Sequence, residues 1–469
     1  MSQLHIPSSR QGAILMTMLE KRGQLGRRAF LRLAAGASAT AALVACVAPT
    51  APAADTGDME QVEIGFAWWT GGEQANALFE EAVDRFEAAF PNIHVVRDSV
   101  PYGEFHTKIL TGYAGGDAPD CHGVPWGTVW SMAHKGVLLD MNGLVEGDPD
   151  IDWEGMWPAV TDGCYYPPGT IISLPRESFG LRLYFYNKAI YEEAGVDTPD
   201  VAMDAGDWNA GNWTWDAWRE QAGQLTQFDE NGRRTIMGSN QSADYWNLHT
   251  VIPSFGHSMF NEDVTHFNLD AEPVVAWLET LPEMINEERS LGKPDETADF
   301  DWASNGKQAI IRSSTWSIPN YRVSWEDIDW DFVPPPRGSH GHSNFVGNDY
   351  HSINGTGTAN VDAAWEPHHF INFPGEVPGG AQHFFGSPFR KENVEPWADS
   401  LNEILPRNGW KYMLDMTNTA TPWTPVPFQE ELNTIHSNEI GQAILGERPV
   451  QEVVDSITSK IAAMIADFE

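Results

Sequence analysis

The sequence predicts an α/β fold in which β-strands and helices alternate along the chain. Short β-rich runs alternate with segments whose apolar residues recur every three or four positions. No internal repeat of fixed period is visible, which argues against a solenoid or a propeller. Such alternation is typical of layers built around a mostly parallel sheet, and 469 residues are enough for two or three domains.

The first predicted elements lie between residues 62 and 135. A β-rich run over 62–69 is followed by two glycines and by a helical stripe of apolar side chains: Phe79, Val83, Phe86 and Phe90. Pro91 ends that helix. We then expect a strand over 93–100, a helix over 102–113, a strand over 121–124 and a helix over 128–135.

A second α/β region begins near Leu181. Residues 181–195 predict a strand followed by a short helix. Thr214 is a candidate N-cap for a helix that sets four side chains on one face: Trp215, Trp218, Ala222 and Leu225. Another amphipathic helix near the end of the sequence presents Val454, Ile457, Ile461, Met464 and Phe468.

The formal charge of −38 is unevenly distributed. Residues 1–45 carry six basic side chains against one acidic side chain, a local +5 that leaves −43 on the remainder. A surface this negative repels nucleic-acid phosphates and anionic lipid headgroups, so neither is an expected partner. The composition fits a salt-adapted surface and an ordinary acidic one equally well.

The N-terminal 45 residues resemble an export signal. Arg27 and Arg28 match a twin-arginine signal, and the apolar run over 33–45 is too short to span a bilayer. The run ends in "LVAC", which resembles a lipobox and implies that Cys46 is lipidated. Residues 46–60 lack apolar periodicity and predict a flexible tether.

Two further cysteines remain, Cys121 and Cys164. Outside the cytoplasm they could form a disulfide bond, and two separate buried thiols are the alternative.

From about residue 61 the order of motifs resembles the family 1 extracellular solute-binding proteins of ABC importers, the group that contains maltose-binding proteins. The matching segments are "APD" (118–120), "KGVLLDM" (135–141), the long run over 173–195, "WTWDAWREQAGQLT" (213–226), "NGKQAIIRSSTWSIPNY" (305–321) and residues 443–461. The polar linker over 197–213 and the histidine-rich segment over 338–357 depart from the family pattern.

This resemblance implies two α/β lobes with a ligand cleft between them. The first lobe would comprise 61–178 plus 352–388, and the second 183–345 plus 389–469. The chain would cross between lobes near 175–182, 345–352 and 386–390, and hinge closure over the ligand would signal to the permease. The resemblance implies a monomer without cofactor or enzymatic activity, anchored on the outer face of the cell membrane or periplasmic, with permease subunits as partners.

Several tryptophans outside the helical stripes are candidates for sugar contacts. A sugar ring offers an apolar face that stacks on an aromatic ring, with hydroxyls around its rim. We expect this role for Trp68, Trp69, Trp126, Trp246, Trp316 and Trp423. For each one alone, packing in the core is the alternative.

Four polar residues are candidates for the hydroxyls. Arg182 offers a fork of donors for a hydroxyl or a carboxylate, and a salt bridge is its alternative. Asn348 and Asp349 could accept from hydroxyls or form a turn. Glu73 could lie at the rim of the site or belong only to the first helical turn.

Neither a metal site nor a catalytic motif is predicted. His340, His342 and His351 do not have the spacing of a ligand set and indicate a solvated loop. Asp148, Asp150 and Asp152 resemble the start of a calcium loop, but Trp153 stands where that loop needs glycine. We therefore expect a receptor that captures a carbohydrate and delivers it to an ABC importer. The alternatives are a receptor for a polyamine, glycerol phosphate or peptide, and a secreted glycoside hydrolase or lyase.

Overall fold

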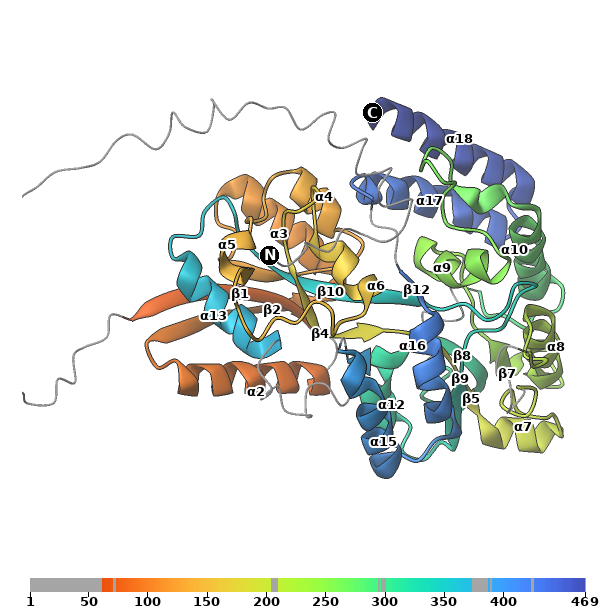
Figure 1. Ribbon diagram of the computed structural model, residues 1–469. Helices are drawn as coiled ribbons and strands as arrows, with labels where there is room; N and C mark the ends of the chain where they lie inside the picture. Colours follow the sequence, from red (N-terminus) through yellow and green to blue (C-terminus); the bar gives the residue numbers. More distant parts are fainter. Residues whose placement is uncertain are drawn as a thin grey trace, which may run out of the picture.

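The computed structural model describes residues 61–70, 73–203, 210–293, 296, 301–372, 387–388, 390–422 and 426–468. These residues form two lobes, each built on its own sheet (Figure 1). The predicted signal, the tether and Cys46 lie outside the described residues. Within the described ranges, no helix has both the length and the apolarity that a membrane crossing requires.

The first lobe is built on a sheet with the order β11-β4-β10-β3-β1-β2, and β12 pairs with β10. Its strands are β1 (Val62–Thr70), β2 (Ile93–Pro101), β3 (Cys121–Val124), β4 (Leu174–Gly180), β10 (Phe345–Ile353), β11 (Ser387–Pro388) and β12 (Thr421–Pro422). The helices of this part are α2 (Glu73–Ala89), α3 (Tyr102–Gly115), α4 (Val129–His134), α5 (Asn142–Val145), α6 (Pro158–Thr161) and α13 (Val361–Asn372).

The second lobe is built on a sheet with the order β6-β7-β8-β5-β9. Its strands are β5 (Arg182–Asn187), β6 (Gln227–Phe228), β7 (Arg234–Ser239), β8 (Gln308–Ser314) and β9 (Trp330–Val333). The helices around it are α7 (Lys188–Ala194), α8 (Trp215–Leu225), α9 (Tyr245–Ser254), α10 (Glu272–Asn286), α12 (Ile318–Ser324), α15 (Val394–Ile404), α16 (Met413–Thr419), α17 (Gln429–Ile444) and α18 (Val450–Phe468).

Both sheets are mixed rather than mostly parallel. β1 runs parallel to β2 and β3, whereas β10 runs antiparallel to β3 and β4. In the second sheet β7 and β8 are parallel, and β5 is antiparallel to both of its neighbours. The expectation of a mostly parallel sheet was wrong because strands that pass between the lobes, such as β4 and β10, join the sheets in the opposite direction.

The chain passes from the first sheet to the second with a single residue in between. β4 ends at Gly180 and β5 begins at Arg182, so Leu181 alone separates the two strands. Beside this crossing, β9 belongs to the second sheet and β10 to the first, and Gly347 of β10 pairs with Gly180 of β4. These neighbouring connections hold the two lobes together, while the exact lobe boundaries given above stay a prediction.

The helices and strands predicted from periodicity are confirmed. The apolar stripe of α2 is buried at Phe79, Val83 and Phe86. At α8, Thr214 is the N-cap, and its hydroxyl accepts a hydrogen bond of 3.1 Å from the Ala217 N–H. The four side chains predicted for the inner face of α8 are all buried.

Of the two alternatives for Cys121 and Cys164, two separate buried thiols are confirmed, since both cysteines are free and buried. The Cys121 thiol in β3 faces the Gly65 carbonyl at 3.7 Å, whereas the Cys164 thiol faces the Val160 carbonyl at 3.8 Å. Burial raises the pKa of both thiols, which keeps them protonated. Each cysteine therefore serves as a small core residue.

The first lobe contains three buried histidines: His122, His351 and His368. His351 lies within β10, so the expected solvated loop is wrong at this residue; His342 is also buried, whereas His340 is exposed. The ring of His351 lies 5.1 Å from that of His368. Burial lowers the pKa of His122 to about 4 and that of His368 to about 3, and it also lowers the pKa of His351.

These histidines predict that acid destabilises the first lobe. The folded protein keeps them neutral, whereas the unfolded chain protonates them below pH ~6.5, so the free energy of unfolding falls as pH decreases from 6.5 towards 4. At pH 5 His122 and His368 each remove about 2 kcal/mol. Urea unfolding at pH 7 and pH 5 measures this loss. H368L should reduce the loss, and H257N, at an exposed histidine, should not. Equal stability of the wild type at both pH values would contradict the account.

Candidate ligand-binding site

A cavity of about 490 Å³ lies between the two lobes. From the first lobe it is lined by Trp68, Trp69, Thr70, Asn76, Phe79, Tyr102, Trp126, Arg176, Gly180, Gly347 and Asp349. From the second lobe it is lined by Arg182, Trp246, Trp316, Ser317 and Asn320. Of the predicted site residues, the structure therefore brings seven together here: Trp68, Trp69, Trp126, Arg182, Trp246, Trp316 and Asp349.

Strand direction explains why the first lobe contributes these residues. β1, β2 and β3 are mutually parallel, so the residues at their carboxyl ends meet at one edge of the sheet. Trp69 stands at the end of β1, Tyr102 directly follows β2, and Trp126 lies two residues beyond β3. This edge faces the second lobe across the cavity.

Trp68 and Trp69 are held firmly in place. The Trp68 indole N–H donates to Asn76 Oδ1 at 3.1 Å, and the indole packs on the Phe79 ring at a centroid distance of 4.4 Å. Trp69 meets the Phe105 ring edge to face at 5.2 Å, and the Arg176 guanidinium lies 5.1 Å from its ring centroid. Both indoles are more than nine-tenths buried, so they form the floor of the cavity.

Trp126 and Trp246 meet across the cleft. Their ring centroids are 4.4 Å apart, and Trp126 belongs to the first lobe whereas Trp246 lies on α9 of the second. Trp126 also stacks on Phe345 of β10 at 5.1 Å. Together these rings form a wall of the cavity that both lobes build.

Trp316 is the most accessible tryptophan at the cavity. It lies in the 3₁₀ turn η4 (Thr315–Ser317) at the end of β8, and 42% of its surface is exposed. An aromatic ring this open beside polar groups is what a sugar face needs for stacking. The Arg182 guanidinium lies 5.1 Å from its ring centroid.

Four indoles of the site lie against glycines. A methyl group added at Gly127 would lie 2.2 Å from the Trp246 ring, far inside van der Waals contact. The other three pairs, with the distance from the added methyl to the ring, are Gly123 with Trp69 (2.7 Å), Gly180 with Trp316 (2.6 Å) and Gly347 with Trp126 (3.2 Å). The lack of a side chain at these positions is therefore what lets the rings reach the cavity.

The structure places only some of the predicted polar residues at the cavity. Arg182 and Asp349 line the cavity. Asn348 does not: it is 1% exposed, and its Nδ2 donates to the Asp349 carbonyl at 2.8 Å. Neighbouring residues of a strand point to opposite faces, which turns Asn348 inward when Asp349 faces the cavity. Glu73 is the first residue of α2, but its side chain lies outside the described part of the structure, and so does Trp423.

Sequence reasoning missed several polar lining residues: Asn76, Tyr102, Arg176, Ser317 and Asn320. Tyr102 had a detectable signal, because an aromatic residue directly after a parallel strand lies at the same edge as Trp69. For Arg176 and Asn320, nothing in the sequence pattern separates them from ordinary surface residues.

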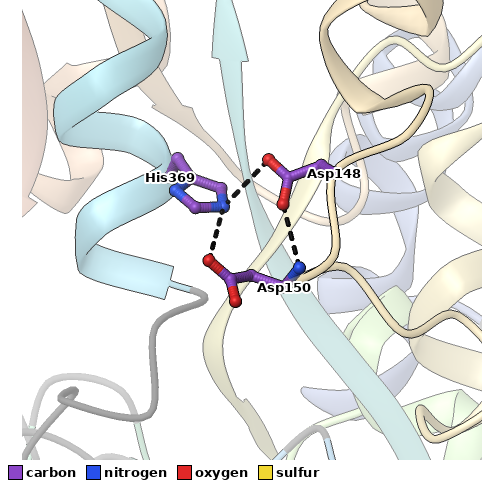
Figure 2. Close-up of side chains that lie close together, drawn as sticks. All are labelled: Asp148, Asp150 and His369. Atoms are coloured by element: carbon purple, nitrogen blue, oxygen red, sulfur yellow. Dashed lines mark hydrogen bonds and ion pairs between the residues drawn. The ribbon is translucent and has the colours of Figure 1, made fainter.

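A separate cluster joins Asp148, Asp150 and His369 (Figure 2). His369 Nε2 of α13 lies 3.1 Å from Asp148 Oδ2 and 3.8 Å from Asp150 Oδ2. The Asp150 N–H donates to Asp148 Oδ1 at 2.9 Å, which shapes the loop. None of the three residues lines the cavity, and the contacts of His369 with the two aspartates join α13 to the loop after α5.

A second contact between the lobes lies at the start of α17. Glu430 accepts hydrogen bonds from Ser131 Oγ at 2.8 Å and Lys135 Nζ at 3.1 Å, and its Oε1 lies 3.0 Å from His106 Nε2. The contact with His106 lowers the pKa of Glu430 to about 2 against the effect of burial, so the carboxylate stays charged at neutral pH. One side chain of the second lobe thus binds three of the first.

We expect Gly127→Ala to disrupt the wall of the cavity. The added methyl group cannot share space with the Trp246 ring, so Trp246 has to move and the Trp126–Trp246 contact opens. Ligand affinity should fall at least tenfold by isothermal titration calorimetry. Gly143→Ala in α5, where an added methyl meets open space, should keep full affinity. Unchanged affinity of the Gly127 variant would contradict this role.

Glu430→Gln should weaken the contact between the lobes. The amide keeps the shape of the side chain but loses the ion pair with Lys135, a loss of about 1 kcal/mol for a partly exposed pair. Urea unfolding at pH 7 measures the change. The matched control is Glu431→Gln, since Glu431 is exposed on the same helix. Equal losses in both variants would show that the contact is not specific.

Comparisons with known proteins agree with this geometry. The sequence profile of the bacterial extracellular solute-binding proteins matches residues 69–373. The chain is 25% identical over 272 residues to an arabinooligosaccharide-binding protein of Halalkalibacterium halodurans, a match that spans 56% of each chain.

Two solved structures share the fold. An ABC substrate-binding protein from Listeria monocytogenes in complex with cycloalternan superposes with a TM-score of 0.76 at 21% identity, covering 87% of this chain and all of the other. A solute-binding protein from Thermotoga lettingae bound with α-D-tagatose gives 0.71 at 16% identity, covering 86% and 99%. With the profile match over most of its length, this chain belongs to the bacterial extracellular solute-binding protein family.

Proposed function

We propose that this protein is the extracytoplasmic receptor of an ABC importer, and that it captures a carbohydrate in the cleft and delivers it to the permease. The observation that carries the proposal is the cavity between the lobes. In this cavity the partly exposed indole of Trp316 lies beside buried indoles and polar side chains. The arabinooligosaccharide-binding relative and the two sugar-bound structures support the same ligand class.

The lining suits a sugar in chemical terms. One face of a sugar ring carries C–H groups that stack on Trp316, and the hydroxyls at its rim need donors and acceptors. Asn76, Ser317, Asn320 and Asp349 supply amide, hydroxyl and carboxylate groups around the cavity. Closing the lobes around the ring excludes water and strengthens each of these hydrogen bonds.

The charges of the lining disfavour the alternatives. A polyamine needs carboxylates, yet Asp349 is the acidic side chain among the described lining residues, against two arginines. Glycoside hydrolysis requires a pair of carboxyl groups flanking the bond, and the described lining supplies one. We therefore propose binding and release without covalent chemistry.

The N-terminal features complete the proposal. Export of the folded protein through the twin-arginine signal, followed by lipidation of Cys46, would hold a monomeric receptor on the outer face of the membrane. The tether over 46–60 would let it search for ligand beside its importer.

A panel of mono- and oligosaccharides, with a polyamine and a peptide for comparison, tests the proposal. Thermal unfolding identifies the ligand, because saturation at 100 times Kd adds about 2.7 kcal/mol to the free energy of unfolding. Trp316→Ala should then weaken binding of the identified saccharide 10- to 100-fold with an unchanged melting temperature of the free protein. Trp302→Phe, outside the cavity lining, serves as the control. Stabilisation by the polyamine or peptide alone would overturn the proposal.

A further inference from the structure

Arg182 occupies a fixed position at the boundary of the two lobes. It is the first residue of β5, and its backbone is clamped by Asn344, which accepts from the Arg182 N–H at 2.9 Å and donates to the Arg182 carbonyl at 2.8 Å. The residue is 8% exposed and still lines the cavity. The residue is therefore buried in protein and borders the ligand space.

The Arg182 guanidinium has few polar partners among the described residues. Its Nη1 donates to the Ser314 hydroxyl at 3.0 Å, and its Nε has no hydrogen-bond partner. Its Cζ also lies 5.1 Å from the centroid of the Trp316 ring and 5.4 Å from that of the Phe345 ring. Within the described part of the chain, no carboxylate oxygen lies within 4.0 Å of this guanidinium.

The surroundings include a second arginine. The neighbouring arginine, Arg312, lies closer to Asp244, with 3.8 Å between Nη2 and Oδ2. Burial and the charge of Arg312 lower the pKa of Arg182 to about 10, although Asp244, Tyr184 and Tyr102 oppose the shift. A buried cation without a counter-ion is costly, and an anionic group that enters the cavity removes this cost.

We infer that the cleft selects a saccharide that carries a carboxylate, such as a uronic acid unit, and that Arg182 is the residue that binds this carboxylate. The inference rests on the proposed function and specifies its substrate class. Arginine presents two parallel N–H groups that match the two oxygens of a carboxylate. Because the Arg182 Cζ lies over the Trp316 ring, 5.1 Å from its centroid, a saccharide bound at this indole lies close to the guanidinium.

The balance of charges favours a single negative charge on the ligand. Asp349 brings a carboxylate to the described lining, and Arg182 brings a buried positive charge, inside a protein with a formal charge of −38. A carboxylate neutralises that charge, whereas a phosphate ester carries close to two negative charges and leaves an excess beside Asp349. A uronate therefore fits better than a sugar phosphate.

Calorimetric titration of the wild type with matched ligands tests the inference. The probes are oligogalacturonates and glucuronate-bearing xylo-oligosaccharides, their carboxyl-reduced counterparts, and a hexose phosphate. We expect at least one acidic saccharide to bind tenfold or more tightly than its carboxyl-reduced form. This comparison needs no variant, so it stands even if a change at Arg182 impairs folding.

Arg182→Gln should abolish the preference, so that acidic and reduced forms bind with equal affinity. The control is Arg407→Gln, since Arg407 also stacks on an indole, Trp330, at 4.4 Å but does not line the cavity. Reduced forms that bind the wild type as tightly as the acids, or preferential binding of the hexose phosphate, would overturn the inference and leave a carbohydrate receptor in place. If no saccharide binds at all, the proposed function itself fails.

Discussion

The binding site depends on close contact between indole rings and bare backbone. An indole is large and flat, and it can face a cavity from a strand end only where the opposite chain leaves room. At Gly123, Gly127, Gly180 and Gly347 a single added methyl group would meet a tryptophan ring at 2.2–3.2 Å. In a close-packed interior such overlap cannot be relieved without moving the ring or the strand. These glycines therefore determine the shape of the cavity as much as the tryptophans do.

Two of these glycines also mark the place where the lobes join. Gly180 and Gly347 are paired neighbours on β4 and β10, the strands beside the crossings. The ring of Trp316, from the second lobe, lies against Gly180. The ring of Trp126, from the first lobe, lies against Gly347. Motion between the lobes must therefore shift Trp316 relative to Gly180 and Trp246 relative to Trp126, which couples the geometry of the cleft to the relative position of the lobes.

Much of the fold could be predicted from the sequence because apolar periodicity reports burial directly. The stripe of α8 and the span of β3 are examples. The sheet directions were predicted less well, since periodicity within a strand carries no information about its partner. For Cys121 and Cys164 the sequence left a disulfide and two separate thiols both open, because it gives no distance between the two thiols.

Some residues of the candidate site could be predicted from the sequence and others could not. Tryptophans at strand ends are rare enough to be noticed, and the predicted ones that the structure describes do meet at the cavity. We expected Asn348 to contact the ligand, but successive side chains of a strand point to opposite faces, so Asn348 is buried where Asp349 lines the cavity. Arg176 and Asn320 were not predicted, because a polar residue in a strand or a short helix has no pattern that distinguishes a ligand contact from a surface position.

The central claim is that a sugar binds between the lobes against the Trp316 ring, and a crystal structure of the protein with its saccharide ligand tests it most directly. The account predicts a sugar ring within stacking distance of the Trp316 indole, with its hydroxyls hydrogen-bonded to side chains of both lobes. A saccharide bound elsewhere on the protein, or one in the cleft that does not contact this indole, would contradict it.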